Sequence, residues 1–352
     1  MDEARWRAAL LLDLARMAKR TRGMTLCAIF FGGGTPSLMS GATVGALIDA
    51  ATGHWPVADA LEITLEANPS SAEAGRFRDY RAAGVTRLSI GIQALRDDAL
   101  RFLGRLHGRE DALAALRLAR ETFPRHSFDL IYARPGQTCA DWRAELDEAL
   151  ALSGGHLSLY QLSIEADTAF HRRHRRGEFC LPDEELAADL YELTDAMTQE
   201  AGLPAYEISN HARPGEECRH NLIYWQGGHY VGIGPGAHGR LPDGTGGAVA
   251  TEQEKHPERW LAALARGEGV KEEKIAPLMR AEEALMMGLR LSAGISRETF
   301  LRLTGQRLEA VVDAAVSADL VARGLLIDDG AHLRASPNGR LLLNALTGAL
   351  LA

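Results

Sequence analysis

Cysteine is scarce in this 352-residue sequence, and its spacing is uninformative for the usual cysteine sites. The four cysteines, Cys27, Cys139, Cys180 and Cys218, are scattered, and no two of them form a C-x-x-C pair. Disulfide scaffolds and cysteine-rich metal sites both depend on closely and regularly spaced cysteines. The sequence therefore indicates neither of these two classes of protein.

Long apolar runs and an excess of positive charge are lacking as well. No stretch reaches the length of a membrane-spanning helix, and the N-terminus does not have the pattern of a secretory signal. The formal net charge is −8, which argues against a broad nucleic-acid-binding surface. We therefore expect a cytoplasmic protein with no nucleic-acid partner.

Two glycine-rich stretches do not match the common phosphate-binding motifs. "FFGGGTPSLM" has no Lys-Ser/Thr pair and is not a P-loop. "GIGPGAHG" contains G-x-G-x-x-G from Gly234 to Gly239, but the following "RLPDGTGG" cannot form the helix that a dinucleotide fingerprint requires. We interpret this second stretch as a loop with bare backbone.

The first glycine stretch points to a ligand. Three consecutive glycines follow the apolar run "LCAIFF", although a tight turn needs only one and each glycine costs backbone entropy. A plain turn is the alternative. We favour a place where the backbone around Gly33 and Gly34 approaches a ligand closely.

The chain predicts an α/β fold with a parallel sheet. The apolar run at 26–31 and the strand-like stretches at 61–69, 85–93, 126–136 and 156–165 alternate with helical patterns, which is typical of βαβ units. A helix precedes the first run, and a further short strand is expected at 205–210. Such sheets either close towards a barrel or stay open and doubly wound.

Polar residues at the strand ends favour the barrel. Nearly every predicted strand carries a polar group at or near its C-terminal end, namely Thr35, Glu66, Asn68, Gln93, Asp129, Gln161 and Glu165. An open sheet concentrates its site at one switch point, whereas a barrel collects residues from all its strands at one mouth. We therefore expect a partial (β/α) barrel over residues 1–240.

The C-terminal part has a different pattern. Residues 241–279 are rich in glycine and polar residues, and we expect a loop or linker there. Residues 280–352 predict the order helix, helix, hairpin, helix of a small winged-helix-like domain, with the turn at Asp329 and Gly330. This segment is not notably basic, so DNA binding is disfavoured.

Two further runs have open interpretations. "CRHNLIYW" is either a capped turn with an aromatic anchor or a histidine ligand beside a stacking surface. A zinc site from His211, Cys218 and His220 is disfavoured because a fourth ligand is missing. The basic run from His171 to Arg176 is expected to be a solvated loop that could attract an acidic group.

Taken in order, several motifs resemble a known family. "FFGGGTPSLM", "LEANP", "RLSIGIQ", "LGRLHG", "FDLIYARPGQT", "LSLYQLSIE", "CRHNLIYW" and "GIGPGAHG" are similar to those of HemW proteins. That family is the haem-chaperone branch of the radical S-adenosylmethionine (SAM) superfamily and is related to oxygen-independent coproporphyrinogen III oxidase. The resemblance covers essentially the whole chain, and "HNLIYW" fits the H-N-x-x-Y-W motif of the chaperone branch.

The resemblance implies two sets of binding residues. Gly33, Gly34 and Thr35 would contact the methionyl end of SAM, while the rest of SAM would be held by Glu66, Gln93, Arg105 and Asp129. Weaker matches are Ser163 and the backbone near Ala237 and His238. The resemblance also implies that His220 contacts haem, with Asn221, Tyr224 and Trp225 around it.

The family signature C-x-x-x-C-x-x-C, which holds a [4Fe–4S] cluster, is not in this chain. We expect the chain to be a fragment or to begin at an internal methionine, so that the first barrel strand and the cluster loop are missing. A homologue that has lost the cluster is the alternative. As written, the chain has no metal ligands for the cluster, and radical SAM chemistry is not expected of it.

The resemblance implies a haem-binding chaperone that delivers haem to haem-requiring proteins, some of them membrane-bound, and that can form a homodimer. One alternative is a radical SAM enzyme like coproporphyrinogen III oxidase, acting in porphyrin biosynthesis. A second alternative is a degenerate barrel with a structural role, which would not bind haem.

Overall fold

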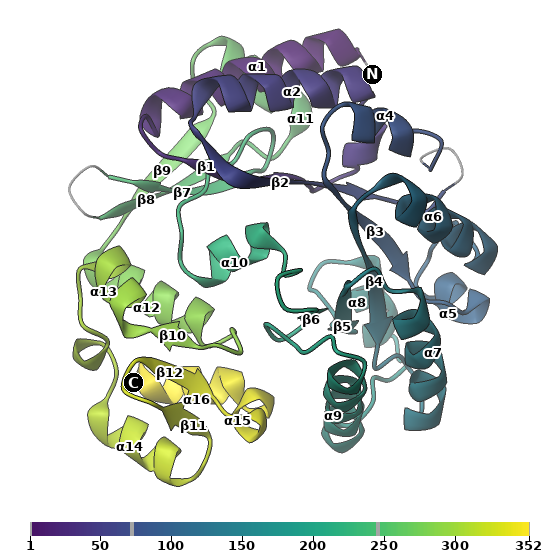
Figure 1. Cartoon of the computed structure of the whole chain (residues 1–352), viewed down its shortest axis with the longest axis vertical. Helices are drawn as coiled ribbons and strands as arrows, with labels where there is room; N and C mark the ends of the chain where they lie inside the picture. Colours follow the sequence, from purple (N-terminus) through teal and green to yellow (C-terminus); the bar gives the residue numbers. More distant parts are fainter. Residues whose placement is uncertain (1, 71–73, 244–246, 352) are drawn as a thin grey trace. The chain divides into compact units, whose positions relative to one another are not determined.

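A computed structural model describes residues 2–70, 74–243 and 247–351. The chain forms two compact units (Figure 1). The first unit contains residues 1–29, 42–62 and 218–352, and the second contains residues 30–41 and 63–217. The two units are described separately below.

The described residues include a six-stranded sheet whose order follows the chain, β1-β2-β3-β4-β5-β6. Its strands are β1 (Leu26–Phe31), β2 (Val57–Ala67), β3 (Arg87–Gln93), β4 (Arg125–Tyr132), β5 (His156–Gln161) and β6 (Asn210–Ala212). β2 to β5 pair in parallel, and β6 is antiparallel to β5. An order without reversal is that of a (β/α) barrel and not of a doubly wound sheet. The predicted α/β partial barrel is confirmed.

Helices of the second unit cover one face of β3 to β5 (Figure 1). They are α4 (Phe77–Ala82), α5 (Asp97–Phe102), α6 (Arg109–Thr122), α7 (Cys139–Leu152) and α9 (Glu184–Glu200). The helix α8 (Ala169–Arg175) belongs to the same unit but does not lie on this face. Thr138 begins α7 with a capping box, and the fully buried Trp142 stacks on Tyr132 with ring centroids 4.9 Å apart. These contacts fix α7 against β4.

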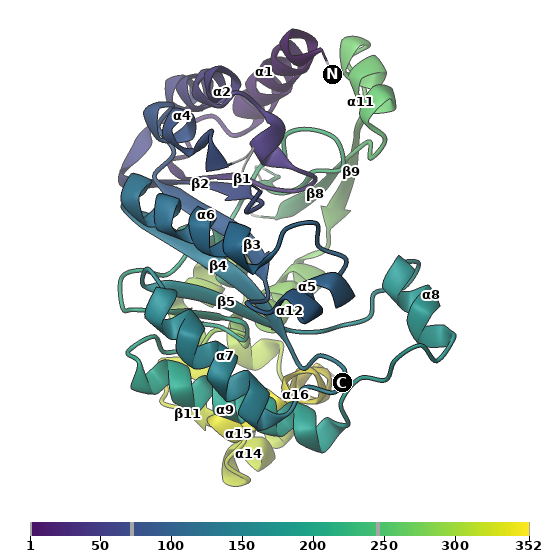
Figure 2. The same cartoon turned by 90° about the vertical axis from the view of Figure 1, so that its right-hand side faces the viewer.

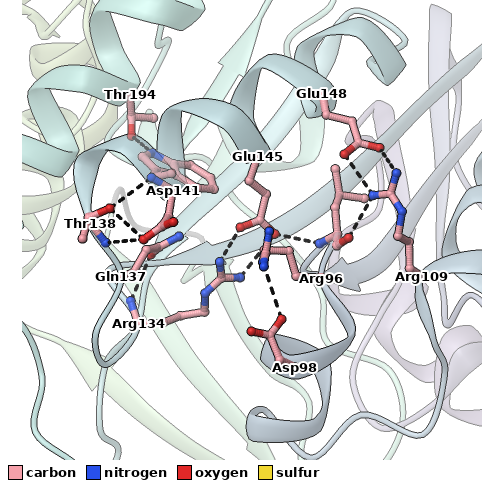
Figure 3. Close-up of polar contacts among 12 residues, drawn as sticks. Arg96, Asp98, Arg109, Arg134, Gln137, Thr138, Asp141, Glu145, Glu148 and Thr194 are labelled. Atoms are coloured by element: carbon pink, nitrogen blue, oxygen red, sulfur yellow. Dashed lines mark hydrogen bonds and ion pairs between the residues drawn. The ribbon is translucent and has the colours of Figure 1, made fainter.

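A polar network joins α7 to the loops that follow β3 and β4 (Figure 3). Glu145 of α7, which is buried, forms an ion pair with buried Arg134 and accepts the N–H of Leu95 at 2.7 Å. One turn further along α7, Glu148 pairs with Arg109 at 2.6 Å, and both of those side chains are about one-third exposed. The loops leaving two strands are thereby fixed to one helix.

In the first unit, α1 (Glu3–Arg20) packs beside α11 (Pro257–Ala265), as Figure 1 shows. The rings of Trp6 and Trp260 stack with centroids 5.8 Å apart and nearly parallel planes. Arg5 and Glu258 form an ion pair across the same two helices at 3.1 Å. The helix α2 (Gly41–His54) lies next to α1, and a hydrogen bond from Thr43 to Glu3 joins them at 2.5 Å.

The expected loop over 241–279 was wrong for its described part, since residues 244–246 lie outside it. β7 (His238–Pro242), β8 (Ala248–Gln253) and β9 (Val270–Ile275) form an antiparallel sheet, and α11 joins the last two strands. Ala248, Val249, Thr251 and Gln253 of β8 are buried, while Ala250 and Glu252 are partly exposed. This alternation is the strand signal that the surrounding glycines and charges obscured. The domain boundaries at 240 and 280 remain a prediction.

The C-terminal segment has the expected hairpin between helices, but in its described residues three helices instead of two precede the hairpin and two instead of one follow it. It comprises α12 (Pro277–Gly288), β10 (Ile295–Ser296), α13 (Arg297–Thr304), α14 (Ala314–Ala322), β11 (Leu326–Asp328), β12 (His332–Ala335), α15 (Pro337–Leu341) and α16 (Leu343–Leu350). β12 pairs antiparallel with both β10 and β11. Gly330 makes the predicted turn with a φ of 82°.

Two smaller expectations were also wrong. The strand expected at 205–210 is instead the short β6 (Asn210–Ala212), preceded by an isolated bridge at Ala205. The basic run is not a loop but the helix α8, which Thr168 caps and which stands away from the sheet on two long connections (Figure 2). Arg173 of α8 lies over three phenylalanine rings at 5.2–5.6 Å, so an aromatic cluster anchors the helix. No helix among the described residues is long and apolar enough to cross a membrane.

Candidate functional site

The first candidate site lies in the second unit, where the parallel strands end. A cavity of about 160 Å³ opens there, lined by Gly34, Thr35, Pro36, Ser37, Glu66, Ala67, Asn68, Ser89, Gly91, Gln93 and Asp129. The turn after β1 and the ends of β2, β3 and β4 all contribute to this lining. Six of the residues singled out from the sequence therefore meet in one cavity: Gly34, Thr35, Glu66, Asn68, Gln93 and Asp129.

The glycine turn forms one wall of the cavity. Gly33 and Gly34 have φ values of 74° and 55°, a conformation that side chains disfavour. A Cβ atom at Gly32 would lie 2.5 Å from the ring of Phe30 and 3.3 Å from Oε2 of Glu66. The N–H of Gly33 donates to that same Oε2 at 3.3 Å. The glycines thus bring bare backbone up to a carboxylate.

Two half-buried carboxylates face the cavity. Desolvation raises the pKa of Glu66, and the hydrogen bond from Gly33 lowers it in part. Desolvation raises the pKa of Asp129 to about 6, opposed by a hydrogen bond from Ser158 and by the charges of Arg87 and Arg105. The charge of Glu66 adds to the rise at Asp129. Arg105 is not among the residues that line the cavity, but its positive charge lowers the pKa of Asp129.

Gln93 ends β3 in a strained backbone conformation. Its φ is 73°, which is uncommon for a residue other than glycine, and the pairing of β3 with β4 shifts between Ile90 and Gln93. The side chain folds back over Gly91, where a Cβ atom would lie 2.9 Å from Nε2 of Gln93. The bulge therefore turns the amide of Gln93 into the cavity.

The sequence did not single out Ser89 and Gly91 as site residues. Both lie on β3 at two-residue steps from Gln93, and alternate residues of a strand share one face. That periodicity is the signal that could have found them.

Ser163 lies in a second cavity of about 420 Å³ in the same unit. This cavity is lined by Ile131, Tyr132, Leu159, Tyr160, Gln161, Leu162, Ser163, Tyr191, Ile208 and Ser209. Its lining carries hydroxyl and amide groups but no charged side chain. Ser163 donates from Oγ to Oε1 of Glu165 at 3.3 Å.

The second candidate site is the helix α10 (Arg219–Trp225) of the first unit, which carries the whole H-N-x-x-Y-W run. The ring of His220 packs edge-on against the ring of Tyr224, with the ring centroids 4.6 Å apart. The ring centroids of Tyr224 and Tyr230 are 4.2 Å apart. Burial raises the pKa of Tyr224 to about 12, so its phenol stays neutral at neutral pH. The guanidinium of Arg290 lies over the ring of Trp225 at 5.1 Å. Asn221 is half-buried on the same helix.

His238 also belongs to the first unit and begins β7 as an exposed residue. Its carbonyl oxygen lies 2.3 Å from where a Cβ atom of Gly232 would be, so the backbone of "GIGPGAHG" approaches itself closely. Ala237 accepts the N–H of Gln253 at 2.9 Å. The segment that was expected to be a loop with bare backbone is instead closely packed against itself where it leads into β7.

Comparison with known proteins identifies the family. Residues 6–149 match the radical SAM superfamily, and residues 275–342 match the HemN C-terminal domain. The heme chaperone HemW of Escherichia coli is 36% identical, over 97% of this chain and 89% of its own length. This chain belongs to the HemW family of the radical SAM superfamily.

Other relatives agree with this assignment. The heme chaperone HemW of Mycobacterium tuberculosis (strain ATCC 25618 / H37Rv) is 38% identical over 99% of this chain and 86% of its own length. The radical S-adenosyl methionine domain-containing protein 1, mitochondrial, of Bos taurus is 40% identical over 100% of this chain and 81% of its own length. Coproporphyrinogen III oxidase (HemN) of Escherichia coli has the same fold, with a TM-score of 0.80, 19% identity, and coverage of 99% of this chain and 83% of that chain.

Membership of the superfamily implies SAM and a [4Fe–4S] cluster as cofactors of HemW-type proteins. The cavity in the second unit suits SAM chemically, because carboxylates, an amide, a hydroxyl and bare backbone line it. The cysteines do not suit a cluster. Cys27 is exposed on β1, and no group of three or more potential metal ligands occurs in the part of the chain that the structure describes. No step through a cluster is derived for this chain.

Proposed function

We propose that this chain binds haem at α10 and passes it to haem-requiring proteins. The observation that carries the proposal is that His220, Asn221, Tyr224 and Trp225 lie together on one half-buried helix. Imidazole is a common axial ligand of haem iron, and aromatic rings suit the face of a porphyrin. Two relatives that share more than a third of their residues with this chain carry the name heme chaperone.

The role proposed for His220 follows from its surroundings. Its ring stands against the edge of Tyr224, which limits the orientations of the imidazole. An axial ligand needs a neutral ring nitrogen directed at the iron, and a ring held by packing meets that need at a lower entropy cost. Trp225, under the guanidinium of Arg290, would extend the apolar surface beside the ligand.

We also propose that the cavity at the strand ends binds SAM. The exposed backbone of Gly33 and Gly34, with the hydroxyl of Thr35, would receive the methionyl end, which carries the amino and carboxylate groups. Glu66, Gln93 and Asp129 offer polar side chains to the rest, with Arg105 balancing the charge of Asp129. Ser163, which lies in the second cavity of the same unit, would make a secondary contact. His238 belongs to the other unit and is not assigned to this cavity. A cluster-bound SAM supplies radical chemistry in the superfamily, and this chain has no ligand set for that cluster.

The proposed partners are haem and haem-requiring acceptor proteins, some of them at a membrane, and a homodimer is the proposed assembly. The cytoplasm is the proposed location, although several relatives are named mitochondrial. Coproporphyrinogen oxidation is not proposed, because the likeness to HemN at 19% identity supports the fold alone.

Haem titration tests the proposal directly. Haem is added to the purified chain and the Soret band is followed. The wild type is compared with His220→Ala and with His332→Ala, whose histidine is partly exposed on β12. We expect binding by the wild type, about 10-fold or greater weakening in His220→Ala, and no change in His332→Ala. Absence of haem binding, or equal binding by both variants, would refute the proposal.

A further inference from the structure

Glu62 places its carboxylate at the start of the helix that carries the H-N-x-x-Y-W run. It belongs to β2, and its side chain is buried, with 3% of the residue exposed. Its Oε1 accepts the N–H of Arg219 at 2.9 Å and the N–H of His220 at 3.5 Å. The thiol of buried Cys218 lies 3.6 Å from the same oxygen. All of these residues belong to the first unit.

The helix has no N-terminal cap of its own. Cys218 occupies the N-cap position and makes no side-chain hydrogen bond to the helix backbone. The first N–H groups of a helix have no partner within the helix, and they carry the positive end of its dipole. Glu62, which lies 157 positions before Arg219 in the sequence, supplies the missing acceptor. Its carboxylate also brings a negative charge to the start of the helix.

Glu62 and the start of α10 stabilise each other's position. A buried carboxylate is costly unless several donors satisfy it, so Glu62 is stable where it is because the start of α10 meets it. In turn, α10 has only seven residues and none of them is fully buried, so packing alone constrains it weakly. The bond to the backbone of His220 therefore acts on the residue that we assign to haem.

We propose that Glu62 is a positioning residue for the haem ligand: it fixes the start of α10 and thereby aims the imidazole of His220. This inference rests on the proposed haem function. Glu62 does not itself touch haem, and its effect passes through the backbone of Arg219 and His220. Groups that orient a metal ligand affect affinity and ligand geometry in the manner of outer-shell partners.

Haem binding by variants of Glu62 tests the inference. Glu62→Gln keeps a neutral acceptor of the same shape, and Glu62→Ala removes the acceptor. Asp313→Ala is the matched control, because Asp313 caps α14 of the same unit by accepting the N–H of Val316 at 2.9 Å. We expect haem affinity to fall about 10- to 100-fold in Glu62→Ala and less in Glu62→Gln. Asp313→Ala should keep haem affinity within about twofold of the wild type, because separate sites act independently.

The spectrum of bound haem separates positioning from general loss of stability. Misaligned imidazole changes the axial ligation, so Glu62→Ala should shift the Soret band and the spin state at saturating haem, whereas Asp313→Ala should keep the wild-type spectrum. Partial recovery in Glu62→Gln supports the positioning role. Wild-type affinity and spectrum in Glu62→Ala would overturn it, and so would equal losses in Glu62→Ala and Asp313→Ala.

Amide hydrogen exchange of the haem-free protein distinguishes failure of this inference from failure of the proposed function. In Glu62→Ala the amides of Arg219 and His220 should exchange about 10-fold faster or more, because each loses a charged acceptor. Faster exchange in a protein whose wild type binds no haem would refute the haem function and leave Glu62 as the cap of α10. Unchanged exchange would refute the positioning role whatever the haem result.

Discussion

The N–H of Gly33 donates to Oε2 of Glu66 across 3.3 Å, which ties the glycine turn after β1 to the end of β2. Because the carboxylate is partly withdrawn from water, this bond offsets some of the cost of its charge. The turn makes this bond with Gly33 in a left-handed conformation, which glycine adopts more readily than other residues. Backbone conformation and carboxylate placement are therefore coupled at this wall of the cavity.

Replacing Gly33 by alanine should destabilise the protein by about 1–2 kcal/mol, the cost of left-handed backbone for an L-residue. A Cβ atom there would meet nothing within 4 Å, so the expected loss comes from the backbone and not from a clash. Gly53→Ala is the matched control, because Gly53 lies inside α2, also with open space at Cβ and without a positive φ. That change should stabilise by roughly 0.5–1 kcal/mol. Urea unfolding measures both, and effects of the same sign would contradict the prediction.

The pH dependence of stability should change when Asp129 becomes asparagine. Desolvation raises the folded-state pKa of Asp129 to about 6, so between roughly pH 4 and pH 6 the folded protein binds more protons than the unfolded chain. Stability contributed by this group is therefore lost as the pH rises through that window. The free energy of unfolding of Asp129→Asn, relative to wild type, should rise by about 2 kcal/mol between pH 4 and pH 7.

Asp141 provides the control of opposite sign. Hydrogen bonds from Thr138 lower its pKa, so its contribution is present at neutral pH and is lost as the pH falls through the lowered value. Asp141→Asn should destabilise the protein at pH 7, and the difference from wild type should fade in acid. Parallel pH profiles for the two variants, measured by urea unfolding, would show that the assigned pKa directions are wrong.

The sequence predicted the strands of the parallel sheet because strand-like runs alternate with helical patterns at the spacing of βαβ units. It also located Glu66, Gln93 and Asp129, because parallel strands end at one edge and polar residues at those ends stand out. It did not predict β8, where glycines and charges on either side obscured a short alternating pattern. It could not predict the contact of Glu62 with α10, because a hydrogen bond across more than 150 residues leaves no local pattern.

Removing the carboxylate of Glu145 should be among the most damaging single changes in the second unit. Glu145→Ala leaves buried Arg134 without its counter-charge and the N–H of Leu95 without an acceptor (Figure 3). We expect a loss of about 3–5 kcal/mol in urea unfolding. Glu148→Ala is the control on the same helix, because its pair with Arg109 is partly exposed and should be worth no more than about 1 kcal/mol.

The double change Arg134→Met with Glu145→Leu separates charge burial from packing. Because it removes both charges together, it should be markedly more stable than Glu145→Ala alone. A double variant as unstable as the single one would indicate that the geometry of the loops, and not the unpaired charge, dominates the loss. A single variant no worse than Glu148→Ala would contradict the prediction itself.

Asp13 should be essential for joining α1 to the loop before β7. It is fully buried, and its carboxylate accepts the N–H of Gly234 at 3.0 Å and the side-chain amide of Gln253 at 3.1 Å. Gln253 in turn accepts from the indole of Trp260 at 3.3 Å, so one carboxylate organises donors from a loop, a strand and a helix.

Asp13→Ala should cost roughly 2–5 kcal/mol, because two buried donors lose their acceptor. Arg16→Ala, which removes a bond at the protein surface to the carbonyl of Gly267, should cost only about 1 kcal/mol. Hydrogen exchange at Gly234 should accelerate in Asp13→Ala and not in Arg16→Ala, and equal acceleration in both would contradict the role assigned to Asp13.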